Sequence, residues 1–302
     1  MSSRGADFSN KNQGGIMKNV MITGANSGLG FETAKKIARD KEFRVILACR
    51  SVQKGEEAKR AIVSDSGNEN IAVMELDTAC LDSVRRFAAA YEKSERGNIY
   101  ALLCNAGISG SHSGLTGDGF DVIFETNHLG HFLLTNLLLP HMETDGLIFA
   151  TSSDMHESPM GKMEWNGADS LAYPNRSLAH ESIRYSYSKL CNLYFIYELA
   201  ERLQARDSGI KANAFNPGLM RTNFMPLNRA SMAFVKMTMP ERYGDLDKSS
   251  DAYARLVTEK GLVKESGLYY DRSVYPKKSS ALSYSVGNRK ELWEKSREYC
   301  GL

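Results

Sequence analysis

The feature that most constrains the fold of this chain is a regular alternation of short apolar runs with longer amphipathic stretches. Seven runs of five to seven residues have the composition of buried strands: NVMIT (19–23), RVILAC (44–49), IAVMEL (71–76), YALLC (100–104), GLIFATS (146–152), IKANAFN (210–216) and, less closely, SGLYYD (266–271). Helix-length segments lie between them, at 31–40, 52–64, 81–93 and 119–143. This alternation predicts an α/β fold of the Rossmann type, with a doubly wound, seven-stranded parallel sheet flanked by helices.

The 302 residues are enough for one large α/β domain, and neither an internal repeat nor a Pro-rich linker divides them. Residues 18–302 are therefore predicted to form a single domain. The polar, Gly-rich stretch 1–17 lacks the apolar segment of a signal peptide and is expected to be a disordered lead-in. Two stretches without regular pattern, 154–181 and 221–248, follow the fifth and sixth strands. Ligands bind beyond the carboxyl ends of such strands, so these insertions are expected to cover a substrate.

The charge of the chain indicates what it can bind, and its cysteines indicate the compartment in which it works. The chain has 38 basic and 36 acidic residues, a net charge of +2, which gives no electrostatic reason for binding nucleic acid or an anionic membrane. No apolar run approaches the roughly 18 residues of a membrane span. The five cysteines are scattered, without a CxxC pair, as is typical of free thiols in a reducing compartment. We expect a cytoplasmic protein that acts on a small molecule.

A glycine-rich loop, TGANSGLG (23–30), follows the first strand and begins a helix. Its glycines are spaced as GxxxGxG. Glycine permits a tight turn and close approach of the backbone to a pyrophosphate, whose charge the helix N-terminus stabilises. Glycine turns after strands also occur for structural reasons alone. The loop nevertheless predicts a nucleotide cofactor, held by Gly24, Asn26, Ser27, Gly28, Leu29 and Gly30.

The end of the second strand favours NADP(H) over NAD(H). Folds that bind NAD place an acidic residue roughly 20 residues after the glycines, where it binds the ribose 2′-hydroxyl. Here the sequence reads ACRSVQK, with no Asp or Glu but with Arg50 and Lys54. Cationic donors suit a 2′-phosphate. The alternative is that both are solvated surface cations.

The ordered set of motifs resembles the short-chain dehydrogenase/reductase family over nearly the whole chain from Lys18. The matching pieces are TGANSGLG (23–30), Asp77 after the third strand, CNAG (104–107), NHLGHF (127–132), the pair Ser152–Ser153, YSYSK (185–189) and NPG (216–218) with Thr222. Two subgroups are most similar, the retinol-dehydrogenase-like reductases and the light-dependent protochlorophyllide reductases. The resemblance implies hydride transfer between a nicotinamide and a carbonyl or alcohol carbon.

The family reaction needs a proton donor at the reacting oxygen, and YSYSK offers two tyrosines for it. A phenol with its ordinary pKa of about 10 is too weak an acid near neutral pH, and a nearby lysine cation lowers that pKa. Residues four apart share a helix face, so Tyr185 and Lys189 are expected to lie together. Tyr187 is two residues before Lys189 and is expected to pack or to form a pocket wall. The YxxxK motif of the family agrees with this choice.

The resemblance also implies roles for further residues. Ser153, with Ser152 as its competitor, would hold the substrate oxygen, and Asn127 would support a water that relays protons to Lys189. Asn216 is expected to be structural, and no metal site is expected at His128 and His131. The implied cofactor contacts, beyond the glycine loop, Arg50 and Lys54, are Asp77, Thr78, Asn105, Ala106, Gly107, Asn127, Tyr185, Lys189, Pro217, Gly218 and Thr222.

Large apolar residues, mostly methionine and aromatic, are frequent in the two irregular stretches and directly before the second. They are Met155, Met160, Met163, Trp165, Leu171, Tyr173, Leu219, Met220, Phe224, Met225 and Met232. Methionine adapts to irregular apolar shapes, so we expect a bulky apolar substrate, such as a retinoid-, steroid- or polycyclic-like ketone. The alternative is that these residues only pack the stretches onto the core. Two other functions stay open: a light-dependent C=C reductase similar to protochlorophyllide reductase, and a non-catalytic NADP(H)-sensing protein. Either a monomer or a homodimer is expected.

Overall fold

The computed structural model describes residues 17–109, 112–158, 161–173, 181–220 and 229–302. One sheet organises them, with the strand order β3-β2-β1-β4-β5-β6-β7-β8. Its strands are β1 (Lys18–Thr23), β2 (Phe43–Cys49), β3 (Ile71–Glu75), β4 (Ile99–Cys104), β5 (Met142–Thr151), β6 (Lys211–Asn216), β7 (Tyr269–Asp271) and β8 (Pro276–Lys277). The predicted doubly wound α/β fold is confirmed.

The strand count differs from the prediction. The first seven strands are parallel, as expected, but β8 pairs antiparallel with β7 and makes the described sheet eight-stranded. The added strand is only two residues long and begins with Pro276. Proline lacks a backbone N–H and is confined to sheet edges, so neither its length nor its composition marks this segment as a strand.

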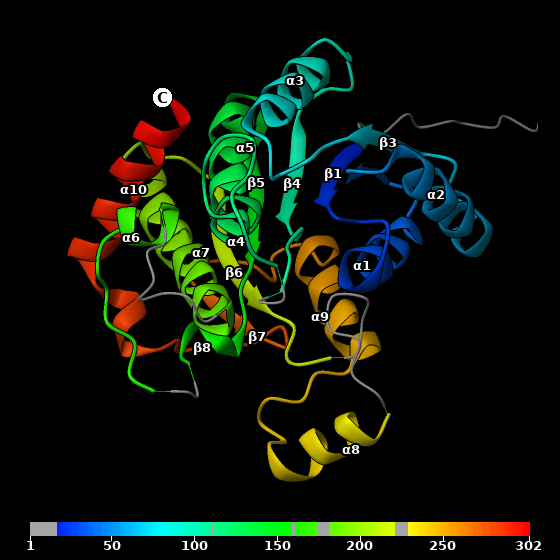
Figure 1. The fold of residues 1–302 in the computed structure, drawn as a ribbon. Helices are drawn as coiled ribbons and strands as arrows, with labels where there is room; N and C mark the ends of the chain where they lie inside the picture. The colour runs from blue at the N-terminus through cyan, green and yellow to red at the C-terminus, as the bar shows by residue number, and fades with distance from the viewer. Residues whose placement is uncertain (1–16, 110–111, 159–160, 174–180, 221–228) are drawn as a thin grey trace, which may run out of the picture.

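Helices cover both faces of the sheet (Figure 1). One face carries α1 (Gly28–Ala38), α2 (Val52–Ser66) and α9 (Leu246–Thr258). The other carries α3 (Leu81–Glu92), α4 (Val122–Phe124), α5 (Gly130–Leu138) and α7 (Glu181–Gln204). Successive strand residues point to opposite faces, so Val20 and Ile22 belong to one core and Met21 to the other.

The helix expected over residues 119–143 is interrupted. The short α4 leads into a five-residue π-helix, Glu125–Leu129, before α5 begins, and a turn of 3₁₀ helix follows at Leu139–His141. At Gly130 a Cβ atom would lie 2.1 Å from the carbonyl oxygen of Thr78, so only glycine permits this close approach. β5 begins at Met142, four residues earlier than predicted. Apolar periodicity alone could not show these changes of helix type.

The last helix, α10 (Val286–Cys300), covers the outer side of α7 (Figure 1). Its Trp293 packs edge-on against Phe132 of α5, with ring centroids 4.9 Å apart, and also against Phe195 of α7. The guanidinium of Arg202 lies 4.5 Å from the Trp293 ring centroid. Between α10 on one side and the sheet on the other, the described side chains of α7 from Arg184 to Ala200 are buried.

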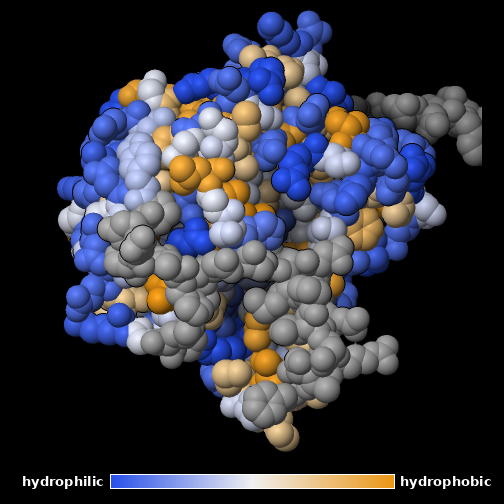
Figure 2. All heavy atoms as spheres, in the orientation of Figure 1, coloured by the Kyte–Doolittle hydropathy of each residue, from blue (hydrophilic) through white to orange (hydrophobic). Residues whose placement is uncertain are grey.

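The two stretches expected to be irregular contain short helices where they are described. A turn of 3₁₀ helix, Asp154–His156, and α6 (Asp169–Ala172) lie in the first, and α8 (Arg229–Thr238) lies in the second. Figure 1 shows α8 projecting from the body of the molecule. In Figure 2 hydrophobic side chains are visible on this projecting lobe, and hydrophilic ones cover most of α2 and α10. Within the described ranges, no helix combines the length and hydropathy that crossing a bilayer requires.

Candidate active site

A cavity of about 520 Å³ lies beyond the carboxyl ends of β1, β4, β5 and β6. It brings together most of the residues predicted for the cofactor and for catalysis. These are Gly24, Asn26, Ser27, Gly28, Leu29, Arg50, Lys54, Asp77, Thr78, Asn105, Ala106, Gly107, Ser153, Tyr185, Lys189, Pro217 and Gly218. Gly30 and Asn127 do not line it, and Thr222 lies outside the described residues.

The glycine loop lines one end of the cavity mainly with its backbone. Gly24 and Gly28 have φ values of +66° and +56°, which side-chain-bearing residues rarely adopt. At Gly30 a Cβ atom would lie 2.5 Å from Asn105 Nδ2 and 2.8 Å from the carbonyl oxygen of Gly24, so this glycine permits the close packing of α1. The first turn of α1 has no acidic residue, and Ser27 makes no side-chain capping bond. The N–H groups there are available to an anion.

A buried threonine fixes the position of the glycine loop relative to β4. The Oγ1 of Thr23 accepts hydrogen bonds from the backbone N–H groups of Asn105 and Ala106, both at 2.8 Å. It also lies 2.9 Å from Nε2 of His131. The other nitrogen of His131 lies 3.2 Å from the carbonyl oxygen of Asn127, which can only accept, so Nδ1 carries the proton. Burial lowers the pKa of His131 to about 4 and keeps its ring neutral.

Asn127 is fully buried in the π-helix and holds the segment after β4. Its Oδ1 accepts from the N–H of Ile108 at 2.8 Å, and its Nδ2 donates to the carbonyl oxygen of Ile108 and to Ser188 Oγ, both at 3.0 Å. The side chain therefore supports the wall of the cavity from behind. The water relay expected of this residue stays a prediction.

Two exposed cations stand where the second strand ends. Arg50 and Lys54 both line the cavity, and Ser51 between them caps α2 by accepting from the backbone N–H of Lys54. Among the described residues, no carboxylate lies within 4.0 Å of either cation. Their charges are thus open to a ligand at this end of the cavity.

Tyr185, Lys189 and Ser153 meet at the other end. The Nζ of Lys189 lies 5.5 Å from the ring centroid of Tyr185 and donates to the carbonyl oxygen of Thr151 at 3.1 Å. A hydrogen bond also links the side chains of Ser153 and Tyr185. The two competing residues point elsewhere: Ser152 Oγ donates to the carbonyl oxygen of Lys189, and Tyr187 OH donates to that of Glu164 at 2.6 Å.

The acidities of these groups differ from the expectation. Burial raises the pKa of Tyr185 above its ordinary value, while the hydrogen bond with Ser153 lowers it in part. Burial lowers the pKa of Lys189 to about 8. Desolvation is the largest cause of both shifts, and Lys189 is not among the groups that lower the pKa of Tyr185, contrary to what the spacing suggested. In this environment Tyr185 holds its proton and Lys189 is close to titration.

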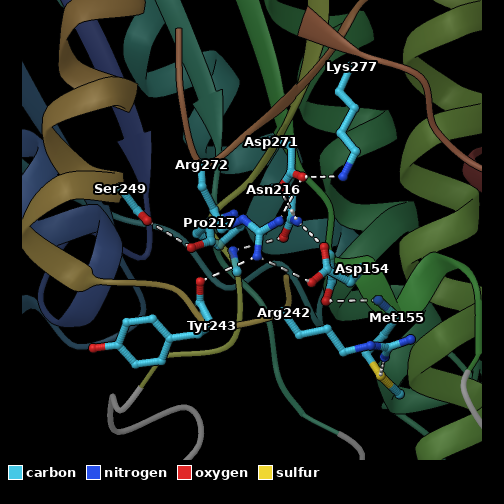
Figure 3. A network of polar contacts seen from close by, with 12 residues as sticks. Asp154, Met155, Asn216, Pro217, Arg242, Tyr243, Ser249, Asp271, Arg272 and Lys277 are labelled. Atoms are coloured by element: carbon cyan, nitrogen blue, oxygen red, sulfur yellow. Dashed lines mark hydrogen bonds and ion pairs between the residues drawn. The ribbon is translucent and has the colours of Figure 1, made fainter. Parts of the chain in front are cut away.

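Sequence reasoning missed a polar network beside Ser153, shown in Figure 3. Asn216, at the end of β6, donates to the carboxylates of Asp154 and Asp271 and accepts from the N–H of Gly218 at 2.9 Å. Arg272 donates to Asp271 at 2.8 Å and lies 4.0 Å from Asp154. The structural role expected for Asn216 agrees with this placement. Asp154 directly follows the serine pair, which is the one local signal that could have found the network.

Five further residues form the wall of the cavity on the Ser153 side. Met155, Leu219 and Met220 belong to the apolar set that the sequence indicated, whereas Asp154 and Arg242 were not predicted. No group of three or more His, Cys, Asp or Glu side chains in the described part of the chain is arranged to hold a metal.

Comparison with known proteins identifies relatives of the chain. The profile of the short chain dehydrogenase family matches residues 18–167. Retinol dehydrogenase 12 from Bos taurus is 32% identical over 295 residues, covering 94% of this chain and 87% of that protein. Protochlorophyllide reductase from Daucus carota is 30% identical over 315 residues, covering 94% and 78%.

Two further matches are a longer protein that aligns only in part and a solved structure. WW domain-containing oxidoreductase from Gallus gallus is 39% identical over 210 residues, which are 67% of this chain and 49% of that protein. The chain thus spans about half the length of that relative. A solved structure of an uncharacterized protein from Mycobacterium paratuberculosis superposes with a TM-score of 0.73 at 32% identity, covering 94% of this chain and 93% of that one.

Proposed function

Since the chain belongs to the short-chain dehydrogenase/reductase family of oxidoreductases, we propose that it transfers a hydride between NADP(H) and a carbonyl or alcohol carbon. The observation that carries the proposal is the cavity itself. It joins a glycine loop with open helix N–H groups to the cluster of Tyr185, Ser153 and Lys189. The proposal treats residues 18–302 as one domain, active as a monomer or homodimer without a metal.

The residues along the cavity fit a dinucleotide. The glycine loop and the first turn of α1 would hold the pyrophosphate, and Asp77 and Thr78 the adenine. Arg50 and Lys54 would bind the 2′-phosphate, since both are exposed and without carboxylate partners in the described chain. Pro217 and Gly218 would border the nicotinamide, whose chemistry is to give or accept the hydride.

The protein's own part in the reaction is to hold the oxygen and move its proton. The Ser153 hydroxyl would donate a hydrogen bond to the substrate oxygen and stabilise the charge that develops on it. Tyr185 would give that oxygen its proton during reduction and take it back during oxidation. The raised pKa keeps Tyr185 in the protonated form that reduction requires, although it also makes the phenol a weaker acid. The ammonium of Lys189 would hold the ribose hydroxyls and balance the phenolate while it exists.

A bulky apolar substrate suits the wall beyond Ser153. Met155, Leu219 and Met220 provide flexible apolar surface there. Three of the apolar residues predicted to cover the substrate, Met160, Phe224 and Met225, lie outside the described residues. Retinol dehydrogenase 12, a relative along almost the whole chain, is named for an apolar alcohol. A retinoid-, steroid- or polycyclic-like ketone is therefore the class to test first.

The deciding experiment follows NADPH oxidation over a panel of ketones, aldehydes and small polar controls. Replacing Tyr185 with Phe should lower kcat by roughly a hundredfold or more, because the proton donor is lost. Tyr187→Phe is the matched control, since its hydroxyl binds the backbone of Glu164 away from the cavity. Equal activity of Tyr185→Phe and the unaltered enzyme would require another mechanism. Reduction of small polar ketones alone would overturn the apolar class.

Cofactor preference has its own test. Arg50→Asp should raise the KM for NADPH by roughly tenfold or more and improve the use of NADH, because a carboxylate repels the 2′-phosphate and can bind the 2′-hydroxyl. Both cofactors are compared under the same conditions with one good substrate. A preference of the unaltered protein for NADH would contradict the assignment.

A light-dependent C=C reductase is the second candidate, favoured by the match to protochlorophyllide reductase over 94% of this chain. Running the panel in darkness and under illumination separates the two, with protochlorophyllide included. Turnover in the dark supports the carbonyl reductase. A protein that binds NADPH tightly yet reduces nothing in either condition would instead be an NADP(H) sensor.

A further inference from the structure

Arg242 occupies a fixed position beside the Ser153 end of the cavity. It lies in the loop between α8 and α9, and its carbonyl oxygen accepts from the N–H of Leu219 at 2.7 Å. The N–H of Gly244 in turn donates to the carbonyl oxygen of Leu219 at 2.8 Å. This ladder holds the backbone of Arg242 against a segment that lines the cavity.

The guanidinium of Arg242 reaches the cavity without a direct counterion. Its Nη1 lies 4.0 Å from the sulfur of Met155, two residues beyond Ser153 (Figure 3). Within the described ranges, no carboxylate oxygen lies within 4.0 Å of this guanidinium. Its charge does act on Asp154: burial raises the pKa of that carboxyl, and the positive charges of Arg272 and Arg242 lower it.

The polar network around Arg242 contains one more positive charge than negative charges. Its anions are Asp154 and Asp271, and its cations are Arg242, Arg272 and Lys277, a net charge of +1. Arg272 and Lys277 both bind Asp271, and Asn216 and Arg272 hold Asp154. A half-buried guanidinium next to Met155, Leu219 and Met220 is stabilised most by a planar oxyanion that it can bind with two hydrogen bonds.

We propose that Arg242 binds a carboxylate of the substrate, which makes the substrate class a bulky keto acid or the corresponding hydroxy acid. The carbonyl would lie at Ser153 and Tyr185, the apolar body on the methionine and leucine wall, and the carboxylate on Arg242. The inference rests on the proposed function and adds an anionic end to the apolar substrate.

The cofactor is the other source of an anion for this arginine. Its phosphates have separate groups to bind them, namely the N–H groups at the start of α1 and the cations Arg50 and Lys54. Arg242 instead contacts Met155 beside the predicted catalytic serine. The contacts therefore favour the substrate, and the experiment separates the two sources.

The test compares keto acids with their methyl esters. Suitable pairs are meta- and para-benzoylbenzoate and a mid-chain oxostearate, each measured with NADPH against its ester. The unaltered enzyme should prefer the acids, and Arg242→Met should lower kcat/KM for the acids by on the order of ten- to a hundredfold and for the esters little. Arg255→Met is the matched control, because Arg255 is exposed on α9 and paired with Glu259.

Each outcome decides one question. Esters reduced as well as acids by the unaltered enzyme would overturn the inference and leave the oxidoreductase assignment standing. A higher KM for NADPH in Arg242→Met, with acids and esters affected equally, would assign the arginine to the cofactor and overturn the inference as well. If no carbonyl in the panel turns over, the proposed function fails. Calorimetric binding of acid and ester to the NADP⁺-loaded protein and its Arg242→Met variant then decides the inference by itself.

Discussion

In the glycine loop the backbone forms the binding surface, whereas at the Ser153 end of the cavity side chains from separate segments form it. Gly24, Gly28 and Gly30 all lie within one eight-residue loop. Asn216 instead joins Asp154 and Asp271, which are 62 and 55 residues away from it along the chain. The glycine loop depends on the backbone conformations that its own residues can adopt. The Ser153 end depends on the sheet, which brings charged side chains from distant parts of the chain together. The two ends should therefore fail in different ways.

The largest effect is expected from Gly30→Ala at the backbone end. A methyl group there would lie 2.5 Å from Asn105 Nδ2 and 2.8 Å from a backbone oxygen, so α1 must shift away from the loop. We expect the Kd for NADPH to rise by roughly a hundredfold or the protein to lose stability, because overpacking costs about 1–3 kcal/mol. Fluorescence titration with NADPH and chemical denaturation measure the two effects.

Gly117→Ala provides the control for this prediction. Gly117 has no heavy atom within 4 Å of the added methyl group and no positive φ. It should therefore bind NADPH like the unaltered protein. If Gly30→Ala also bound normally and kept its stability, close packing at the loop would not be what holds the cofactor.

Arg272→Met tests the side-chain end. Arg272 bonds Asp271, lies beside Asp154 and donates to the carbonyl oxygen of Tyr243 at 3.3 Å. Without it the half-buried Asp154 loses a counterion, and the segment that carries Ser153 loses an anchor. We expect kcat to fall roughly tenfold, the unfolding free energy to fall by about 1–3 kcal/mol, and the Kd for NADPH to stay within about twofold.

Arg272→Lys should recover part of the lost kcat, since it keeps the charge but not the paired donors. A loss of NADPH affinity in Arg272→Met as large as the loss of kcat would show that the two ends are coupled rather than separate.

Lys189 has two proposed roles, one toward the cofactor ribose and one toward Tyr185, and the pH dependence of activity tests both. Its pKa of about 8 means that the ammonium is present below that pH and is lost as the pH rises through it. Both proposed roles need the charge, so kcat/KM for carbonyl reduction should fall above pH 8, about tenfold per pH unit. The raised pKa of Tyr185 keeps the phenol protonated over this range. Lys189→Arg should move the decline to higher pH; a decline that stays near pH 8 would assign it to another group.

The smallest effect is expected from Lys277→Met. Lys277 binds the same carboxylate as Arg272, at 2.9 Å, but its side chain is 63% exposed. Exposed ion pairs contribute about 0–1 kcal/mol, so kcat and stability should change little. Thermal unfolding and steady-state kinetics measure this. A loss comparable with that of Arg272→Met would mean that total charge, rather than buried geometry, organises the network.

The same contrast explains how much the sequence could predict. Apolar runs and the order of the motifs predicted the α/β sheet, the glycine loop and the tyrosine–lysine pair, because each depends on local spacing. The π-helix at Glu125–Leu129 and the edge strand at Pro276 were not predicted, since tertiary contacts determine both. The position of Arg242 at the cavity was not predicted for the same reason. It depends on backbone hydrogen bonding with Leu219, which lies on the other side of a segment that contains α8.

The packing of α10 over α7 has a consequence for how the protein behaves on dilution. The helix that carries Tyr185 and Lys189 is enclosed by the chain's own last helix, through Trp293 and its aromatic neighbours. Its burial is thus an intramolecular event, independent of how many copies are present. Specific activity should then stay constant from micromolar to nanomolar protein, where an active site completed by association would lose its shape.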